Sequence, residues 1–191
     1  MLFRSILATN ENNLLTRFIL NGDYSLGAVA QTSSPSMDIQ VASNFERYLY
    51  YLNGEDAQRT RQDMERFGAS GSLQFDELAQ ERVRADFSSR SVNETETIET
   101  IRDFYTLHGY VLDPHTAVGV KAGLAGREAG VPMICLATAH PAKFGAAVER
   151  AIGHEPELPP SLAGLANKEP RCEVIPAEVG AVKAFVEQHA L

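Results

Sequence analysis

The sequence is poor in the features that mark several protein classes. It holds two cysteines, Cys135 and Cys172, and no CxxC pair, so it has neither a disulfide framework nor a zinc-ligand signature. No stretch reaches the roughly 18 apolar residues that a membrane span needs. The apolar start at 1–7 is too short for the core of a signal peptide. We therefore expect a cytoplasmic protein with no bound metal and no membrane partner.

Positive charge is also scarce. The 191 residues include 17 basic and 25 acidic side chains, which gives a net charge of -8. Such a surface repels a phosphate backbone, so we expect no nucleic-acid partner. A local basic pocket for a small phosphorylated ligand remains compatible with this composition, because net charge does not describe a cleft. The hydrophobic share of 44% is sufficient for a packed core.

Apolar runs and turn signals predict an α/β protein. Buried strands are expected at 2–8, 131–136 and 171–175. Helices are expected between these runs and after them, at 14–21, 37–52, 94–108, 115–129, 142–152 and 178–189. Strands that alternate with helices through short links favour a mainly parallel sheet in a three-layer arrangement.

Residues 55–92 differ from the rest of the chain in their high content of charged side chains. Their spacing predicts a solvated helical excursion and not a binding site. The acidic run at 94–99 is interpreted as the start of a helix, with a capping box at Ser91–Glu94, in preference to a metal site.

Three loops join a buried element to the start of a helix, at 8–13, 34–38 and 136–144. Helix N-termini present free N–H groups, so polar side chains in these loops are candidates for binding a phosphorylated small molecule. Helix capping explains the same side chains without any ligand. Asn10 or Asn12, for example, are suitable caps for the helix that follows them.

Four sequence blocks resemble a known family. Residues 136–144, LATAHPAKF, are similar to the C-terminal signature of threonine synthase. The segment at 8–18, the block from SPSMDI to SNFER at 34–47, and DPHTAVG at 113–119 resemble further blocks of that family. The blocks occur in the family's order and together span nearly the whole chain, which makes the resemblance specific.

The resemblance implies a fold-type II pyridoxal-phosphate (PLP) enzyme, similar in fold to the tryptophan synthase β subunit. Residues 1–191 would be the C-terminal part of its catalytic domain. Enzymes of this family convert O-phospho-L-homoserine and water to L-threonine and phosphate, with the cofactor as an electron sink. A β-replacement synthase or a dehydratase of the same fold is disfavoured by the TAHPAKF block.

The resemblance also assigns residues. Thr138 would donate a hydrogen bond to the pyridine nitrogen of PLP, although by composition alone it is a cap or turn residue ahead of Pro141. Asn10 and Asn12 would face the cofactor ring. Arg17 and Arg47 are either clamps for the substrate phosphate or surface charges. The candidates for substrate binding are Ser34, Ser36, Asp38, His115, His140 and Lys143.

The chain departs from the family in two respects. The Schiff-base lysine and the Gly-rich phosphate loop of the family both precede the first block, and neither occurs here. The four lysines, Lys121, Lys143, Lys168 and Lys183, do not match the catalytic position. Without that lysine and that loop the chain alone is expected to be inactive, and to need the N-terminal part of the same enzyme as a partner. The alternative is a non-catalytic remnant that acts as an interaction or small-anion-binding module.

Overall fold

The computed structural model describes residues 5–190, so residues 2–4 of the first expected strand lie outside the described residues. The chain forms two compact units, one up to Glu157 and the other from Leu158 onwards. The first unit carries every candidate site residue. Among the described helices, none combines the length and apolar character that a membrane crossing needs.

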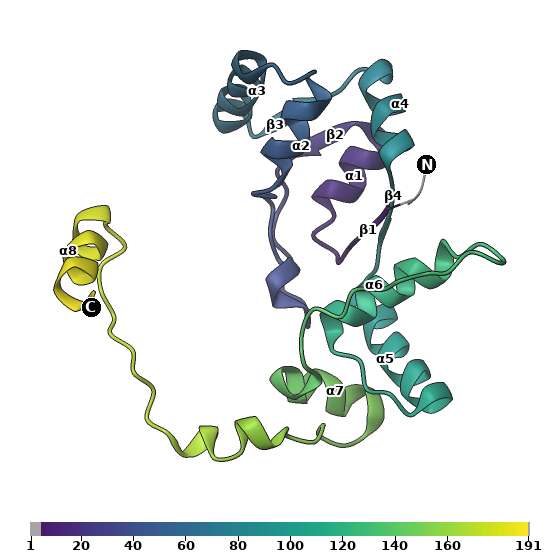
Figure 1. The fold of residues 1–191 in the computed structure, drawn as a ribbon, viewed down its shortest axis with the longest axis vertical. Helices are drawn as coiled ribbons and strands as arrows, with labels where there is room; N and C mark the ends of the chain where they lie inside the picture. The colour runs from purple at the N-terminus through teal and green to yellow at the C-terminus, as the bar shows by residue number, and fades with distance from the viewer. Residues whose placement is uncertain (1–4, 191) are drawn as a thin grey trace. The chain divides into compact units, whose positions relative to one another are not determined.

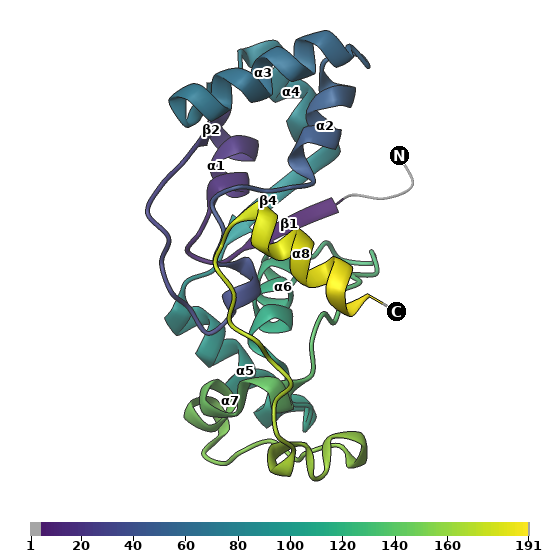
Figure 2. The same ribbon diagram turned by 90° about the vertical axis from the view of Figure 1, so that its left-hand side faces the viewer.

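A parallel pair of strands lies at the centre of the first unit. Strand β1 (Ser5–Thr9) pairs with β4 (Phe87–Ser91), from Ser5 opposite Phe87 to Thr9 opposite Ser91. Helices α1 (Leu14–Asn21) and α6 (Pro114–Ala125) contact this pair from opposite sides, as both ribbon views show (Figures 1 and 2). The predicted α/β architecture, with helices on both faces of a parallel sheet, is confirmed.

An aromatic core lies on the α1 side of the strands. Phe18 of α1 is buried and meets Phe45 edge to face, with ring centroids 4.8 Å apart. The Tyr24 ring stacks on Phe45 at 3.9 Å. Around this core lie β2 (Asp23–Ser25), α2 (Phe45–Leu52), α3 (Ala57–Ser70), β3 (Ser72–Gln74) and α4 (Glu77–Asp86). β2 and β3 are antiparallel.

The charge-rich segment 55–92 therefore contributes α3, β3, α4 and the central strand β4. Most of its charged side chains are exposed, but Phe67, Leu73 and Val83 are buried in the aromatic core. The sequence of β4, FSSRS, has no apolar alternation, which is why no strand was expected there.

A second core lies between α5 (Glu94–His108), α6 and α7 (Gly145–Ile152), and it includes Ile98, Ile101 and Val120. α5 begins with a capping box formed by Asn93 and Glu96, two residues after the expected position. It ends at His108, as predicted, and Gly109 follows in the left-handed conformation.

Several expected elements differ from those observed. The helix predicted at 37–52 is a short 3₁₀ turn, η1 (Pro35–Met37), followed by the separate α2. The helix predicted at 115–129 ends at Ala125, and Gly126 follows it against Ile6, where a Cβ would lie 2.5 Å from Ile6 Cδ1. The helix predicted at 142–152 is divided into η2 (Pro141–Phe144) and α7.

Two predicted strands do not form. Residues 131–136 and 171–175 are irregular and largely exposed, and in the described part of the chain neither pairs with another strand. An apolar run becomes a strand only beside an edge that supplies hydrogen bonds. The second unit contains η3 (Pro160–Leu162), η4 (Leu165–Asn167) and the predicted final helix, α8 (Val179–His189).

Candidate active site

Asn10 follows the end of β1 and is buried. Its amide nitrogen lies 2.9 Å from Thr32 Oγ1, 3.0 Å from Ser34 Oγ and 2.7 Å from Asp38 Oδ1. Its Oδ1 accepts the backbone N–H of Asn12 at 2.9 Å. A single side chain at the carboxyl end of the strand therefore holds the start and the end of the 32–38 loop together.

Asn12 extends this network to Ala30. Its Nδ2 donates to Ala30 O at 2.9 Å and to Asp38 Oδ1 at 3.0 Å, and its Oδ1 accepts the Ala30 N–H at 2.9 Å. The expected capping of α1 by Asn10 or Asn12 is wrong, because the N-cap position is Asn13 and no side chain caps the helix there. The two asparagines hold a loop and do not cap a helix.

The Asp38 carboxylate accepts hydrogen bonds from Thr32 of its own loop and from Asn10 and Asn12. Its Oδ2 accepts the Thr32 N–H at 2.9 Å, and its Oδ1 accepts the Thr32 hydroxyl at 2.7 Å as well as the two asparagine amides. The chain turns away from a helical path at this residue, because the carboxylate faces back towards Thr32. This explains why no continuous helix begins at Met37.

Glu94, the first residue of α5, anchors the same loop from the other side. Its carboxylate accepts the Ser33 N–H at 3.0 Å, the Ser33 hydroxyl at 2.5 Å and Arg150 Nη1 at 3.0 Å. Burial alone would raise the pKa of the Glu94 carboxyl, but the hydrogen bonds from Ser33 and Arg150 outweigh burial and hold that pKa below its ordinary value. Glu94 is therefore ionised at neutral pH.

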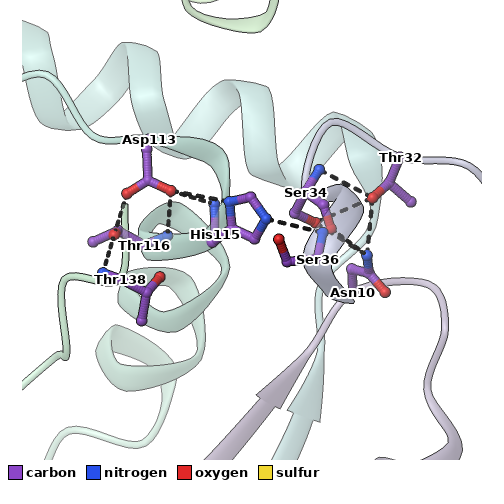
Figure 3. Close-up of polar contacts among 8 residues, drawn as sticks. All are labelled: Asn10, Thr32, Ser34, Ser36, Asp113, His115, Thr116 and Thr138. Carbon is purple, nitrogen blue, oxygen red and sulfur yellow. Dashed lines mark hydrogen bonds and ion pairs between the residues drawn. The ribbon is translucent and has the colours of Figure 1, made fainter. Parts of the chain in front are cut away.

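His115 lies in the first turn of α6 and faces the 34–36 turn (Figure 3). Its Nε2 is 3.2 Å from the Ser36 backbone nitrogen, and its Nδ1 is 3.1 Å from Asp113 Oδ1. Asp113 is the N-cap of α6 and accepts the N–H groups of His115 and Thr116. Its Oδ2 also accepts the Thr116 hydroxyl.

Thr138 reaches this group through its backbone. Its N–H donates to Thr116 Oγ1 at 3.2 Å, whereas its own hydroxyl has no hydrogen-bond partner among residues 5–190. The segment before it lies close to α6 because Gly123 has no side chain. A Cβ at Gly123 would lie 2.8 Å from Cys135 Sγ.

The remaining candidates lie elsewhere or serve the fold. His140 Nδ1 accepts the Ala142 N–H and so caps η2, and Lys143 is exposed in that turn. Arg17 of α1 is bound by Asp23 and by Ser25, so it serves as a structural link between α1 and β2. Arg47 lines an open groove between α2 and α3 that includes no residue of the network.

The structure thus brings together six of the predicted site residues: Asn10, Asn12, Ser34, Asp38, His115 and, through its backbone, Thr138. Ser36 joins them through its backbone N–H and keeps an exposed side chain. The residues that sequence reasoning did not single out for the site are Thr32, Glu94, Asp113 and Thr116. Asp113 and Thr116 stand within a block that resembles the family, which was the available signal.

Solved structures share the fold of this chain. The PLP-bound threonine synthase from Brucella melitensis superposes with a TM-score of 0.87 at 42% identity, over 96% of this chain and 40% of that one. The threonine synthase from yeast gives a TM-score of 0.84 at 36% identity, over 96% and 41%. The fold is that of a part of a fold-type II PLP-dependent enzyme.

Sequence comparison identifies the family within that class. The family described as "Threonine synthase, C-terminal" matches residues 116–186. Threonine synthase from Pseudomonas aeruginosa is 45% identical over 186 residues, which is 96% of this chain. The chain belongs to the threonine synthase family and matches its C-terminal part. It spans 40% of the length of the Pseudomonas relative.

Proposed function

We propose that this chain forms the C-terminal part of a cytoplasmic threonine synthase active site, which converts O-phospho-L-homoserine and water to L-threonine and phosphate with PLP. The observation that carries the proposal is the state of the Thr138 hydroxyl. Its hydroxyl is exposed and unpartnered among the described residues, while its backbone is held by Thr116. A hydroxyl that is carried on a held backbone and has no partner in the protein suits a ligand atom that accepts a hydrogen bond.

Thr138 fits the ring nitrogen of PLP, which accepts a hydrogen bond in its neutral form. When bound, PLP supplies an electron sink that stabilises negative charge on the substrate carbons. Asn10 and Asn12 are assigned to the frame around the cofactor, because their amide donors already have acceptors within the chain. Asp38 belongs to the same frame.

Ser36 and Lys143 are the proposed contacts for the phosphorylated substrate. Ser34 is buried, with its hydroxyl held by Asn10 and Thr32, and belongs to the frame. The Ser36 and Lys143 side chains are exposed, and hydroxyl and ammonium groups both donate to phosphate oxygens. The nearby carboxylates of Asp38 and Glu94 oppose such a ligand less than free carboxylates would, because each accepts several hydrogen bonds. His115 and His140 act here through loop geometry, since both accept backbone N–H groups.

The Schiff-base lysine and the cradle for the cofactor phosphate must come from the preceding part of the enzyme. Lys121, Lys143, Lys168 and Lys183 contribute no hydrogen bond to the polar network described above. The exposed apolar side chains of Val131, Ile134 and Leu136 are the proposed contact surface for that preceding part. Large apolar side chains seldom cluster on a surface that stays exposed to solvent in the complete protein.

Phosphate release from O-phosphohomoserine tests the proposal. The purified chain with PLP is expected to release none. The chain joined behind the preceding part of the Pseudomonas relative is expected to release phosphate, and Thr138→Val in the joined protein is expected to weaken PLP binding. Thr138→Ser, which keeps the hydroxyl, is the matched control.

Two results would count against this function. A joined protein that folds but neither binds PLP nor releases phosphate would favour the non-catalytic, anion-binding alternative. Release by the chain alone would mean that one of its own lysines serves as the Schiff base.

A further inference from the structure

A chain of hydrogen bonds links the two sides of the proposed site through three buried polar residues. Asp113 is 2% exposed, Thr116 5% and His115 9%. The hydrogen bonds run from the Ser36 backbone to His115, then to Asp113, Thr116 and the Thr138 backbone (Figure 3). Burying a carboxylate costs free energy unless its oxygens accept several hydrogen bonds. The buried Asp113 carboxylate is therefore a feature whose function needs an explanation.

Chemistry at the Ser36 end fixes the His115 tautomer. The Ser36 backbone N–H can only donate, so His115 Nε2 must accept and must be unprotonated. In a neutral imidazole the proton then lies on Nδ1, which donates to Asp113 Oδ1. Asp113 therefore accepts at this oxygen, and His115 connects the 34–36 turn to it in a defined orientation.

The same argument applies from the other end. The Thr138 backbone N–H can only donate, so Thr116 Oγ1 accepts it. The Thr116 hydroxyl hydrogen is then directed to Asp113 Oδ2. Every bond in the relay has a single direction, and both arms end on the two oxygens of one carboxylate.

On the basis of the proposed function, we propose that Asp113 and Thr116 are positioning residues that set the Thr138 hydroxyl against the cofactor ring. His115 ties the substrate-side turn to the same carboxylate. Because Thr116 holds the backbone nitrogen of Thr138, its loss frees the peptide that carries the cofactor-binding hydroxyl. The two sides of the site are thereby held in one fixed relation.

Helix capping accounts for only part of this geometry. A cap at Asp113 needs the N–H groups of His115 and Thr116, which Oδ1 accepts. The bond from the Thr116 hydroxyl to Oδ2, and the acceptance of the Thr138 N–H by that hydroxyl, add nothing to the cap. These two bonds are therefore the ones to remove.

The test uses the joined protein and compares Thr116→Val with Thr116→Ser. Valine has the shape of threonine without the hydroxyl, whereas serine keeps the hydroxyl. The readouts are amide hydrogen exchange at Thr138 and the dissociation constant for PLP. We expect Thr116→Val to accelerate exchange at Thr138 and to weaken PLP binding about fivefold or more, the ratio for one lost hydrogen bond. Thr116→Ser should remain within about twofold of the parent.

Asp113→Asn provides a second variant in case valine at 116 prevents folding. Asparagine is also a strong N-cap, so α6 keeps its start, but its amide nitrogen cannot accept the Thr116 hydroxyl. It should also accelerate exchange at Thr138 and weaken PLP binding. Unchanged exchange and PLP affinity in Thr116→Val, or in Asp113→Asn if the former does not fold, would overturn the positioning role. Equal effects of valine and serine at 116 would overturn it as well.

Failure of the proposed function gives a different pattern. Hydrogen exchange at Thr138 needs neither cofactor nor turnover. A joined protein without PLP binding, in which Thr116→Val still accelerates exchange, would refute the enzyme assignment and with it the cofactor-positioning role, but would leave the Thr116–Thr138 hydrogen bond established. A joined protein with normal turnover and no response to Thr116→Val would refute the positioning role alone.

Discussion

Glu94 is expected to couple energetically to Ser33, and the size of the coupling follows from their contacts. Two bonds join them, from the Ser33 N–H at 3.0 Å and from its hydroxyl at 2.5 Å. The Arg150 side chain is 58% exposed, so its ion pair contributes less than about 1 kcal/mol. A hydrogen bond to a charged group is worth about 1.5–3 kcal/mol, and Glu94→Gln replaces that charge with a neutral amide. We expect Glu94→Gln to lower the free energy of unfolding by about 1.5 kcal/mol.

A double-mutant cycle with Ser33→Ala tests this reasoning. The double variant should lose about 0.5–1 kcal/mol less than the sum of the single variants, because each single change already removes the hydroxyl–carboxylate bond. Urea denaturation of the purified chain, followed by circular dichroism at neutral pH, measures all four stabilities. Effects that add to within about 0.4 kcal/mol would refute the proposed coupling.

The same pair predicts a pH dependence. The pKa of Glu94 is lowered in the folded chain, so the folded state favours the ionised carboxylate. Its stabilising contribution is fully present above the unfolded pKa and is lost as the pH falls through the lower folded pKa. The stability difference between the parent chain and Glu94→Gln should therefore shrink on acidification below about pH 4.5, the ordinary pKa of a glutamate side chain.

Three further predictions concern the packing around the site. Phe18→Ala should lower the free energy of unfolding by about 3–5 kcal/mol in the same assay, because the ring is buried and meets Phe45. Gly123→Ala should destabilise the chain by about 1–2 kcal/mol, since its Cβ would lie 2.8 Å from Cys135 Sγ, whereas Gly119→Ala has open space and should be neutral or stabilising. Partial burial raises the pKa of the Cys135 thiol, so iodoacetamide at pH 8 should label it more slowly in the folded chain than in urea, with Cys172→Ser used to isolate the signal.

Local sequence patterns correctly predicted the helices that are determined by contacts between residues close together in the sequence. Helix α1 combines an apolar stripe through Leu14, Phe18 and Ile19 with a glycine just past its end, and it forms where expected. α6 begins at Asp113–Pro114 for an equally local reason, a capping carboxylate followed by a proline in the first turn. In both helices the deciding contacts lie within a few residues of the chain.

Elements that depend on a distant partner were not predictable in the same way. β4 is a strand because β1 lies beside it, although its own sequence is polar. Residues 131–136 are apolar enough for a strand, yet no edge pairs with them among the described residues. An apolar run indicates that its side chains become buried, but it does not indicate which segment or which chain covers them.

In the candidate site, too, contacts within a sequence block were predictable and contacts between distant segments were not. Family resemblance pointed to Thr138 and His115, because both stand in matched blocks. It did not indicate that Thr116 holds the Thr138 backbone, since those residues are 22 positions apart and meet through the close approach at Gly123. Such a contact depends on tertiary packing, which a single sequence does not display.

The pairing of β1 with β4 also has a consequence for synthesis of the chain. The bond from Ser89 Oγ to Leu7 O joins residues 82 positions apart. At about 5–20 residues per second, the ribosome needs roughly 4–16 seconds to add β4 after β1. During that interval β1 has no strand partner among the described residues, and of α1 and α6 only α1 is present to cover it. Binding of a chaperone during translation would therefore be expected first at this strand.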